Sequence, residues 1–468
     1  MKKTVTVMKF GGSSVGDAER IRNVAAIVAR SPGRIVVVTS AMAGVTDMLI
    51  RATELAATRH TKELRAVLED IVAKHRRTVD ELAVPAERAN EMRHAIDALG
   101  DELKESLEEI QAAAQCSSQQ YDGVVSFGER FSIVVVAAAI TNSGHSAEPV
   151  EATRLIVTSD HFTDAEPFLD KSTGRVVSVL GPLLDSNTIP VVTGFIGQTV
   201  DGKITTLGRG ASDYTATILG YCLDAKQVWI WTDVTGVMTA DPRLIPEAKT
   251  IAQLSYAEAS ELSYFGAKVL HPLTMVPASL KNIPIFIKNT FEPEQIGTRI
   301  AAHTDDGGVK AITVKSELSL LTVQGKGVTG VPSVAAKVFG ALASERIDVY
   351  MISQASSEHN ISFVVKGSSG VLAVEKVHSA LVDEMSSKDV DIVQLKNGLS
   401  IVAVVGNDMY NLPGVTGKTF ASMGVSGVEI IAISYGSSER SISFVVESAD
   451  AVTAIKSLHH TFQLVKKR

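Results

Sequence analysis

The first residues of the sequence that could do chemistry are a lysine, two glycines and two serines behind a short apolar run. In "VMKFGGSSVG", residues 7–16, Lys9 closes a β-type segment, and Gly11 and Gly12 follow it. Backbone amides without a neighbouring Cβ can approach phosphate oxygens closely, and a lysine supplies positive charge to the same oxygens. The stretch therefore indicates a phosphate site. A ligand-free turn from strand to helix also favours Gly and Ser, and no GxxxxGK[ST] or GxGxxG motif decides between these interpretations.

Further clusters of small, hydroxyl and charged residues follow at intervals along the chain. They are "TSAMAGVTDML" (39–49), "SFGERFS" (126–132), "LGRGASDYTAT" (207–217) and "WTDVTGVMTADPR" (231–243). In the third cluster, glycines surround Arg209, and Ser212 and Asp213 then begin a helix whose N-terminus can hold an anion. Taken singly, each cluster is better explained as a turn or a helix cap.

The elements that must carry these clusters change that conclusion. From Thr4 to about residue 300, short β-branched runs alternate with helical segments, a pattern typical of a largely parallel sheet covered by helices on both faces. Ligands of such sheets bind beyond the carboxyl ends of the strands, where these clusters lie, so chance explains the set poorly. The runs are "VTVMKF" (5–10), "RIVVVTS" (34–40), "TIPVVTGFI" (188–196), "QVWIWTD" (227–233) and "IPIFIK" (283–288).

Residues 47–118 differ from this alternation, because Ala, Leu, Glu, Lys and Arg recur there at helical spacing. The pattern predicts two or three helices with an interruption near Pro85. A coiled coil is the alternative, but it requires a heptad sustained over ~3–4 repeats, which the segment does not show.

The residue pattern changes after "HTDDGG", residues 303–308, and we place a domain boundary there. Residues 325–365 align without a gap with residues 406–446, so that Pro332 matches Pro413 and Phe339 matches Phe420. Each copy reads as a split βαβ unit. Two copies are too few for a solenoid, which normally needs about three or more repeats, so a pair of small packed domains is predicted.

Composition excludes several classes of function. A chain of 468 residues exceeds one compact core, so two or three domains are expected. The net charge of −7 offers no general attraction to nucleic acid or to anionic membranes. Cys116 and Cys222 show no CxxC spacing and are expected to be buried thiols.

A membrane span and a signal peptide are not expected either. The longest apolar run, Ile133 to Ile140, is shorter than the ~20 residues that a spanning helix needs. The N-terminus reaches Lys9 before a signal-peptide core could form, so a cytoplasmic location is expected.

In order and over nearly the whole chain, the motifs resemble those of the aspartate kinases of the amino acid kinase family. The resemblance implies an α/β fold, with a three-layer αβα amino acid kinase domain and a mostly parallel sheet at residues 1–303. It further implies a regulatory region at 304–468 with two ferredoxin-like (ACT) α+β domains, at about 318–390 and 398–468. The matching motifs are "KFGGSSV", "SAMAGVTD", "FGER", "GRGASDYTA", "WTDVTGVMTADPR", "FGAKVLHP" and "IKNTFEPEQIGT".

Carried over residue by residue, the resemblance implies a catalytic pair, a substrate site and a nucleotide site. Lys9 would meet the ATP phosphates, and Asp213 would orient Lys9. Glu129 would hold the ammonium group of aspartate, and Arg209 its α-carboxylate. The residues that would line the rest of the aspartate site are Ser40, Thr46 and Ser212. The residues that would contact the nucleotide are Lys9, Gly11, Gly12, Thr232, Asp233, Met238, Arg243 and Lys268.

The sequence departs from the family pattern at three positions. Ala211 stands where a second Gly is usual, and a negative φ is required if alanine is to be tolerated there. Met238 replaces a Tyr that commonly approaches the adenine, and a flexible apolar side chain is a plausible replacement. Thr235 stands where Asp or Pro is common. The histidines lack ligand spacing, so no protein-held metal is predicted; His271 in "VLHP" is a weak exception near the nucleotide loop.

The reaction implied is ATP-dependent phosphorylation of the aspartate β-carboxylate, the first step toward lysine, threonine and methionine. A β-carboxylate with a reference pKa near ~3.9 is ionised at pH 7, so no general base is needed. Positioning, Lys9, Lys268 and a Mg²⁺ carried by ATP would supply the catalysis. The alternatives are another amino acid kinase, acting on glutamate or a nucleoside monophosphate, and a catalytically silent amino acid sensor.

The paired repeats are expected to associate into a homo-oligomer and to bind a regulatory amino acid. A dimerisation module without an effector is the simpler alternative. Gln354 in "ISQASSEHNISFVV" resembles threonine-sensitive members, whereas Tyr435 replaces the second Gln of some of those enzymes. Threonine is therefore favoured as effector and lysine is the second choice. The chain ends soon after the second repeat, so a monofunctional kinase without a dehydrogenase fusion is expected.

Overall fold

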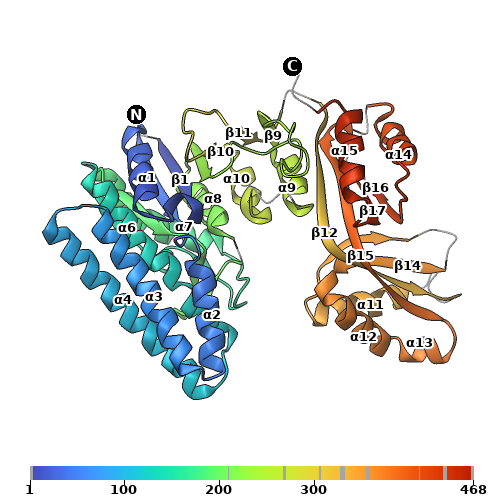
Figure 1. Ribbon diagram of the computed structural model, residues 1–468, viewed down its shortest axis with the longest axis horizontal. Helices are drawn as coiled ribbons and strands as arrows, with labels where there is room; N and C mark the ends of the chain where they lie inside the picture. Colours follow the sequence, from blue (N-terminus) through green and yellow to red (C-terminus); the bar gives the residue numbers. More distant parts are fainter. Residues whose placement is uncertain are drawn as a thin grey trace. The chain divides into compact units, whose positions relative to one another are not determined.

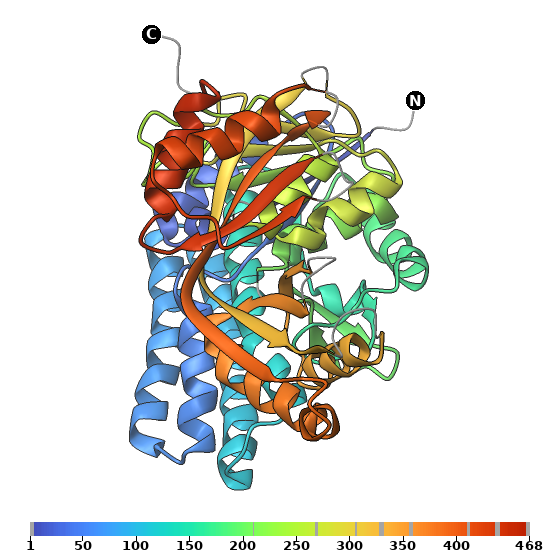
Figure 2. The same ribbon diagram turned by 90° about the vertical axis from the view of Figure 1, so that its right-hand side faces the viewer.

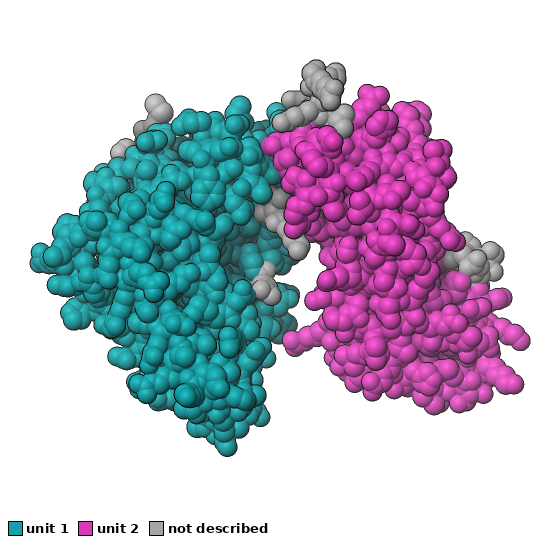
Figure 3. Space-filling view, in the orientation of Figure 1, with its two compact units in different colours: residues 1–237, 252–256, 269–303 teal, residues 238–251, 257–268, 304–468 magenta. Residues whose placement is uncertain are grey.

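The chain forms two compact units, which Figure 3 distinguishes by colour. Unit 1 comprises Met1–Val237, Ala252–Tyr256 and Val269–His303, and unit 2 comprises Met238–Ile251, Ala257–Lys268 and Thr304–Arg468. The structure is a computed structural model and describes residues 4–208, 210–266, 270–304, 307–326, 332–354, 359–409, 412–435 and 440–464.

Unit 1 is built on an eight-stranded sheet in which every neighbouring pair is parallel except β10 with β11. In sheet order the strands are β3 (Ala147–Val150), β5 (Ile189–Thr193), β2 (Arg34–Thr39), β1 (Val5–Phe10), β8 (Gln227–Thr232), β10 (Ile285–Asn289), β11 (Thr298–Ala301) and β9 (Gln253–Ser255). The predicted runs all contain strands, which confirms the mostly parallel sheet. A small second sheet holds β4 (Val157–Thr158), β6 (Ile196–Thr199) and β7 (Ile204–Thr206).

Helices cover both faces of the main sheet and complete three layers (Figure 1). On one face, α6 (Phe127–Asn142) packs on β2, β3 and β5, with α1 (Ala18–Arg30) beside it. On the other, α7 (Leu169–Asp185) packs on β5, and α8 (Ser212–Cys222) packs on β1, β2 and β8. The remaining short elements are α10 (Met275–Leu280), η1 (Gly12–Val15), η2 (Ala152–Arg154) and η3 (Pro272–Thr274).

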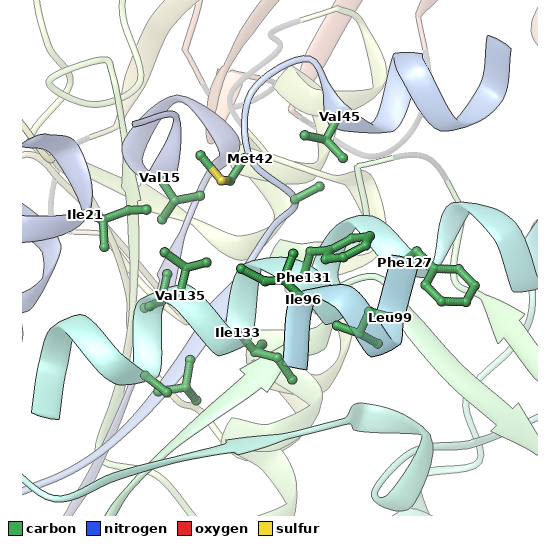
Figure 4. Packing of buried hydrophobic residues seen from close by; sticks show 14 of the residues in the cluster. Val15, Ile21, Met42, Val45, Ile96, Leu99, Phe127, Phe131, Ile133 and Val135 are labelled. Carbon is green, nitrogen blue, oxygen red and sulfur yellow. The ribbon is translucent and has the colours of Figure 1, made fainter. Parts of the chain in front are cut away.

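The predicted helical region is confirmed as α2 (Val45–Ala57), α3 (Thr61–Glu81) and α4 (Ala86–Ala113), with the break at Pro85. α3 and α4 lie side by side (Figures 1 and 2). Their apolar residues are continuous with the core, because Ile96 and Leu99 of α4 join the same buried cluster as Phe131 and Val135 of α6 (Figure 4). These helices therefore thicken one outer layer of unit 1.

The stretch Ser118–Asn142, formed by α5 (Ser118–Val125) and α6, is long and apolar enough to cross a membrane by length and composition. Because 83% of its apolar window is buried inside the protein, we assign it as a core helix. It was missed from the sequence because Glu129 and Arg130 divide the apolar residues into shorter runs.

Unit 2 contains a six-stranded antiparallel sheet. In sheet order its strands are β13 (Val349–Ser353), β14 (Asn360–Lys366), β12 (Gly308–Gln324), β15 (Ile392–Asn407), β17 (Ser441–Glu447) and β16 (Ala432–Tyr435). The helices of this unit are α9 (Tyr256–Tyr264), α11 (Pro332–Ser344), α12 (Gly370–Ala380), α13 (Val382–Ser386), α14 (Val415–Val425) and α15 (Ala451–Thr461), with the turn η5 (Gly367–Ser369). The first residue of α9, Tyr256, belongs to unit 1.

β12 and β15 run through two lobes of this sheet, as Figure 2 shows. In the first lobe, residues 318–324 of β12 pair with β14 and with the beginning of β15. In the second lobe, residues 401–405 of β15 pair with β17 on one side and with residues 311–315 of β12 on the other. The second lobe is therefore completed by a strand segment that precedes the first lobe in the chain.

The sequence repeat is visible as matched aromatic pairs in the two lobes. In the first lobe the rings of Phe339 and Phe363 meet at 5.1 Å, and in the second the rings of Phe420 and Phe444 meet at 6.1 Å. Each pair joins a helix to a strand at positions that the repeat aligns. The predicted pair of small α+β domains is thus confirmed.

Residues 238–251 belong to unit 2 because their apolar side chains join the core of the second lobe. Ala240 and Ile245 are buried in the cluster that contains Phe444. The Thr239 hydroxyl also lies 2.9 Å from Nε2 of the buried His459 on α15.

Candidate active site

Four neighbouring strands of unit 1 end at one edge of the main sheet. Phe10 at the end of β1 lies opposite Thr39 of β2 and Trp231 of β8, and Thr39 lies opposite Thr193 of β5. The residues at or beyond these ends therefore meet there, as expected for an open α/β sheet. Among the predicted site residues they are Lys9, Gly11, Gly12, Ser40, Thr232 and Asp233.

Lys9 and Asp213 form the ion pair at the centre of this edge. The Lys9 Nζ lies 2.6 Å from Oδ1 of Asp213, and both side chains are nearly buried. Lys9 comes from β1 and Asp213 from the first turn of α8, where a carboxylate also interacts favourably with the helix dipole. The strand and the helix hold the ammonium group of Lys9 in one place.

Glu129 supplies a second buried carboxylate, in the first turn of α6. Its Oε1 accepts a hydrogen bond from the Ala41 amide at 3.0 Å, whereas Oε2 is buried and has no partner among the described residues. Burial raises the pKa of Glu129 to about 8, although the Ala41 amide and the charge of Lys9 oppose the shift. A buried carboxylate oxygen without a partner costs free energy, and a cationic group of a ligand would satisfy it.

Close packing around Ala41 places Glu129 beside the end of β1. A Cβ on Gly128 would lie 2.7 Å from the Ala41 Cβ, and a Cβ on Gly12 would lie 3.0 Å from the Ala41 carbonyl oxygen. A side chain at Gly128 would force its surroundings to shift, and one at Gly12 would be tightly packed, because the beginnings of α6 and η1 approach the loop after β2 so closely.

The phosphate-donor role of Gly11 stays a prediction, and the structure gives the present partner of its amide. Its amide already donates to the Trp231 carbonyl oxygen at 3.1 Å, because the hydrogen bonding between β1 and β8 continues one residue past Phe10. Gly12 begins η1, whose first amides have no intrahelical acceptor, so this position remains a proposed phosphate donor.

Of the other residues predicted for the aspartate site, the structure describes Ser40, Thr46 and Ser212. Ser40 and Thr46 are half-buried, at the end of β2 and in the first turn of α2. Ser212 is buried at the start of α8, and a Cβ on Gly194 would lie 2.6 Å from its side chain. Arg209 lies outside the described residues, as does Lys268.

The neighbours of Arg209 show how its loop is shaped. Gly208 and Gly210 have φ values of +89° and +84°, in the left-handed region that favours glycine. Ala211 has a φ of −76°, so the negative φ required for an alanine at this position is confirmed.

The predicted nucleotide residues after β8 fall in both units. Thr232 and Asp233 belong to unit 1, where the Thr232 hydroxyl donates to Asp233 Oδ1 at 3.1 Å. Met238 and Arg243 belong to unit 2. The Met238 Sδ accepts a hydrogen bond from Thr250, and the exposed guanidinium of Arg243 pairs with Asp241.

His271, which precedes η3, packs against the start of α8. Its ring stacks on Tyr214 with centroids 6.0 Å apart, and it packs beside Gly208. Burial lowers the pKa of His271, against the opposing influence of the Asp213 and Asp164 carboxylates.

Two residues near the site carry no signal that a motif search would find. Phe195, between β5 and β6, has a φ of +70°, which is rare for a bulky side chain. Asp122 on α5 is fully buried and accepts three hydrogen bonds. An acidic residue shortly before Glu129 in "YDGVVSFGER" was the only trace of it in the sequence.

The candidate effector residues occupy matching strand ends in unit 2. Gln354 is exposed directly after β13, and Tyr435 is the last residue of β16, paired with Ile442 of β17. The turns that follow them, 355–358 and 436–439, lie outside the described residues. Of the cysteines, Cys222 is buried as predicted, whereas Cys116 is half-buried in the loop between α4 and α5.

The described part of unit 1 can thus offer an ammonium group, a buried carboxylate acceptor and strand-end amides at one edge of the main sheet. Within the residues that the structure describes, no group of three or more His, Cys, Asp and Glu side chains could hold a metal ion. The arrangement can bind an anion at Lys9 and a cation at Glu129.

Comparison with protein families finds two kinds of domain. A model of the amino acid kinase family matches residues 4–289, and an ACT domain model matches residues 321–381 and 402–462. Among curated proteins, the chain is 36% identical over 476 residues to the chloroplastic bifunctional aspartokinase/homoserine dehydrogenase 1 of Zea mays. The match covers 98% of this chain and 50% of that protein, so the chain spans about half the length of this relative.

Two solved structures resemble the chain over nearly all of its length. Aspartokinase III of E. coli, in complex with aspartate and ADP (R-state), matches with a TM-score of 0.85 and 31% identity, over 98% of this chain and 100% of that one. The E. coli enzyme in complex with lysine and aspartate (T-state) matches with a TM-score of 0.77 and 30% identity, over 98% and 99% of the two chains.

Proposed function

The chain belongs to the amino acid kinase family, and from that premise we propose that it is an aspartate kinase. It transfers the terminal phosphoryl group of ATP to the β-carboxylate of L-aspartate and forms 4-phospho-L-aspartate, a first step toward lysine, threonine and methionine. The observation that carries the proposal is the buried Glu129 oxygen that lacks a partner among the described residues, close to the Lys9–Asp213 ion pair. One group suits the ammonium of an amino acid, and the other suits a phosphate.

The residues of this chain act by position and charge. The acceptor carboxylate is ionised at pH 7, so it attacks the terminal phosphorus without a general base while the bond to the ADP oxygen breaks. Lys9, fixed by Asp213, neutralises charge on the phosphoryl oxygens in the transition state. A Mg²⁺ ion would be held by the nucleotide phosphates and would neutralise part of their charge; Asp213, already paired with Lys9, is not proposed as its ligand.

Aspartate is held at both ends of its backbone. Glu129 binds the ammonium group, Arg209 binds the α-carboxylate, and Ser40, Thr46 and Ser212 line the pocket. A bidentate arginine suits a carboxylate better than lysine does. The proposed nucleotide contacts are Gly12, Thr232, Asp233, Met238, Arg243 and Lys268. The E. coli relative whose structure contains aspartate and ADP supports this pair of ligands.

We assign residues 1–303 to catalysis and residues 304–468 to regulation by an amino acid bound at the ACT repeats, which also form the contacts of a homo-oligomer. Threonine is the first effector to test, on the basis of Gln354. Lysine is the second, and the lysine complex of the E. coli relative supports it.

A coupled assay of ADP release tests the proposed function. The intact chain should release ADP only when ATP, Mg²⁺ and aspartate are all present. A glutamate- or nucleotide-dependent signal would identify another amino acid kinase, and no signal with any acceptor would indicate a silent sensor.

Lys9→Ala makes the assay specific to the site. The substitution should lower kcat by about 10²–10³-fold, the range for removing one transition-state donor, with a smaller rise in KM for aspartate. Lys104→Ala is the matched control, since Lys104 pairs with Glu108 on the exposed face of α4. An unchanged kcat in the Lys9 variant, with equal rises in both KM values, contradicts the role.

A further inference from the structure

Asp122 is a buried carboxylate to which the proposed reaction assigns no part. It lies on α5 with 0% exposure. Its Oδ2 accepts hydrogen bonds from the backbone amides of Thr163 and Thr206, at 2.8 and 2.9 Å, and its Oδ1 accepts one from the Thr206 hydroxyl at 2.8 Å. A carboxylate withdrawn from water must have its lone pairs satisfied. These bonds tie the loop that contains Thr163, and the end of β7 with the loop that follows it, to α5.

The first loop is constrained at the point where Asp122 holds it. Thr163 has a φ of +74°, which a β-branched residue adopts only where its surroundings enforce it. Two residues later, the Ala165 amide donates to the Thr206 carbonyl oxygen at 2.8 Å. The loop is therefore bonded at two points: Thr163 to Asp122, which also binds Thr206, and Ala165 to Thr206 itself, the last residue of β7.

The second loop connects Thr206 to α8 and contains Arg209. The Leu207 amide donates to the Phe195 carbonyl oxygen at 2.9 Å, which fixes the start of the loop. The Lys9–Asp213 ion pair fixes its end. The position proposed to bind the α-carboxylate thus lies three residues beyond a residue that Asp122 anchors.

The same pair of helices carries Glu129. The Ser126 amide donates to the Asp122 carbonyl oxygen at 3.1 Å, and α6 begins at the next residue. Asp122 and Glu129 therefore lie on two consecutive helices, Asp122 bonded to Thr206 and Glu129 next to the proposed ammonium site.

We propose that Asp122 is a positioning residue for the amino acid substrate. It fixes the end of β7 at Thr206 relative to the helices that carry Glu129, and hence the room that the site leaves for an amino acid beside the Glu129 carboxylate. The inference rests on the proposed aspartate kinase function. It assigns Asp122 no part in nucleotide binding.

Steady-state kinetics of Asp122→Ala tests this role. We expect KM for aspartate to rise by about tenfold or more, as for lost hydrogen bonds to a charged group, and KM for ATP to stay within about twofold. Calorimetric titration with aspartate alone should show the same loss of affinity. Asp122→Asn should restore KM for aspartate to within about threefold, because its carbonyl oxygen can accept from both amides while its NH₂ donates to the Thr206 hydroxyl.

Ser172→Ala is the matched control. The Ser172 hydroxyl is equally buried, accepts from the Val157 amide at 3.0 Å and donates to the Phe168 carbonyl oxygen at 2.8 Å, but it is not bonded to Thr206. This variant should lower Tm without changing KM for aspartate. A similar rise of KM in Ser172→Ala, or equal rises of both KM values in Asp122→Ala, overturns the proposal.

If Asp122→Ala does not fold, Thr206→Val tests the positioning role of Asp122 instead. It leaves Asp122 Oδ1 without its donor and should raise KM for aspartate several-fold; an unchanged KM contradicts the inference. Failure of the proposed function is a separate outcome, because then the unmodified chain would release no ADP with aspartate and ATP.

Discussion

At the scale of single residues, the site contrasts two buried carboxylates. Asp213 meets the ammonium group of Lys9, whereas Glu129 meets one backbone amide and has a second oxygen without a partner among the described residues. Burial therefore dominates at Glu129 and raises its pKa to about 8. Between pH 4.5 and 8 the ligand-free protein holds a proton that a bound ammonium group must displace.

This proton predicts a pH dependence of aspartate binding. Below about pH 8, binding must release the proton, so KM for aspartate should rise as the pH falls, by up to tenfold per unit. Glu129→Gln should raise KM and remove the dependence. Kinetics at constant ionic strength between pH 6 and 9 checks this, and a flat profile for the unmodified chain would argue against it.

The same proton predicts the opposite trend for folding. The folded pKa of Glu129 lies above its ordinary value of 4.5, so its stabilising contribution is complete below pH 4.5 and is lost as the pH rises through 8. Relative to the unmodified chain, Glu129→Gln should become more stable from pH 5 to 8, by up to about 1.4 kcal/mol per unit. Urea unfolding at several pH values measures the difference; a constant difference would show that Glu129 is not protonated.

At the scale of elements, α6 connects the site to the core. Its first turn carries Glu129, and its buried Phe131 stacks on His75 of α3, with ring centroids 4.6 Å apart. His75 Nδ1 lies 2.8 Å from the Ile71 carbonyl oxygen and Nε2 has no partner among the described residues. Burial lowers the pKa of His75 to about 4, so the outer helices are held by a neutral imidazole.

His75 should make unit 1 sensitive to acid. Its folded pKa of about 4 lies below the ordinary 6.5, so its contribution is present above pH 6.5 and is lost as the pH falls toward 4. The loss amounts to roughly 3 kcal/mol over this window. His75→Leu should reduce the decline of Tm between pH 7 and 4.5; His60→Leu, at an exposed position, is the control and should not.

A buried ion pair fixes α9 to the sheet of unit 2. Lys310 Nζ of β12 lies 3.1 Å from Glu258 of α9, and both side chains are almost fully buried. Lys310→Met removes the ammonium group that pairs with the buried Glu258 carboxylate and should destabilise unit 2 by about 3–5 kcal/mol. Lys310→Met combined with Glu258→Leu should recover most of the loss in denaturant unfolding; additive losses would mean that the pair is not coupled.

At the scale of the whole molecule, two units with separate buried clusters divide the chain. The repeat aligns β13 with β16, so an amino acid effector has two equivalent strand ends available. Only the first carries a glutamine, Gln354, in exposed position among the described residues.

The regulatory half is tested by titrating activity with threonine and with lysine. One of them should inhibit, and Gln354→Ala should shift half-inhibition to about tenfold higher concentration, as for one lost polar contact. Gln394→Ala, an exposed glutamine of the same lobe, is the control. Inhibition by lysine alone would overturn the preference for threonine, and no response to either would leave the repeats as an oligomerisation module.

Local sequence patterns were sufficient for the parallel strands, the break at Pro85 and the repeat, because burial and turn chemistry act over a few residues. They also indicated Lys9, Glu129 and Asp213, which follow strands or begin helices. The bond from the Gly11 amide to Trp231 could not be predicted, since it depends on the register of β1 with β8. Asp122 and the membership of residues 238–251 in unit 2 depend in the same way on contacts between distant segments.

Because β12 and β15 each take part in both lobes of unit 2, the sequence repeat does not coincide with a unit that is complete by itself. An excised second copy, beginning near residue 398, would carry its whole repeat and yet lack residues 308–315. One side of residues 401–407 would then be an unpaired strand edge, able to form hydrogen bonds with a strand of another polypeptide. Although the copies are successive in the gene, the second therefore cannot be moved into another protein at the boundary of its repeat without losing a strand segment that lies before the first copy.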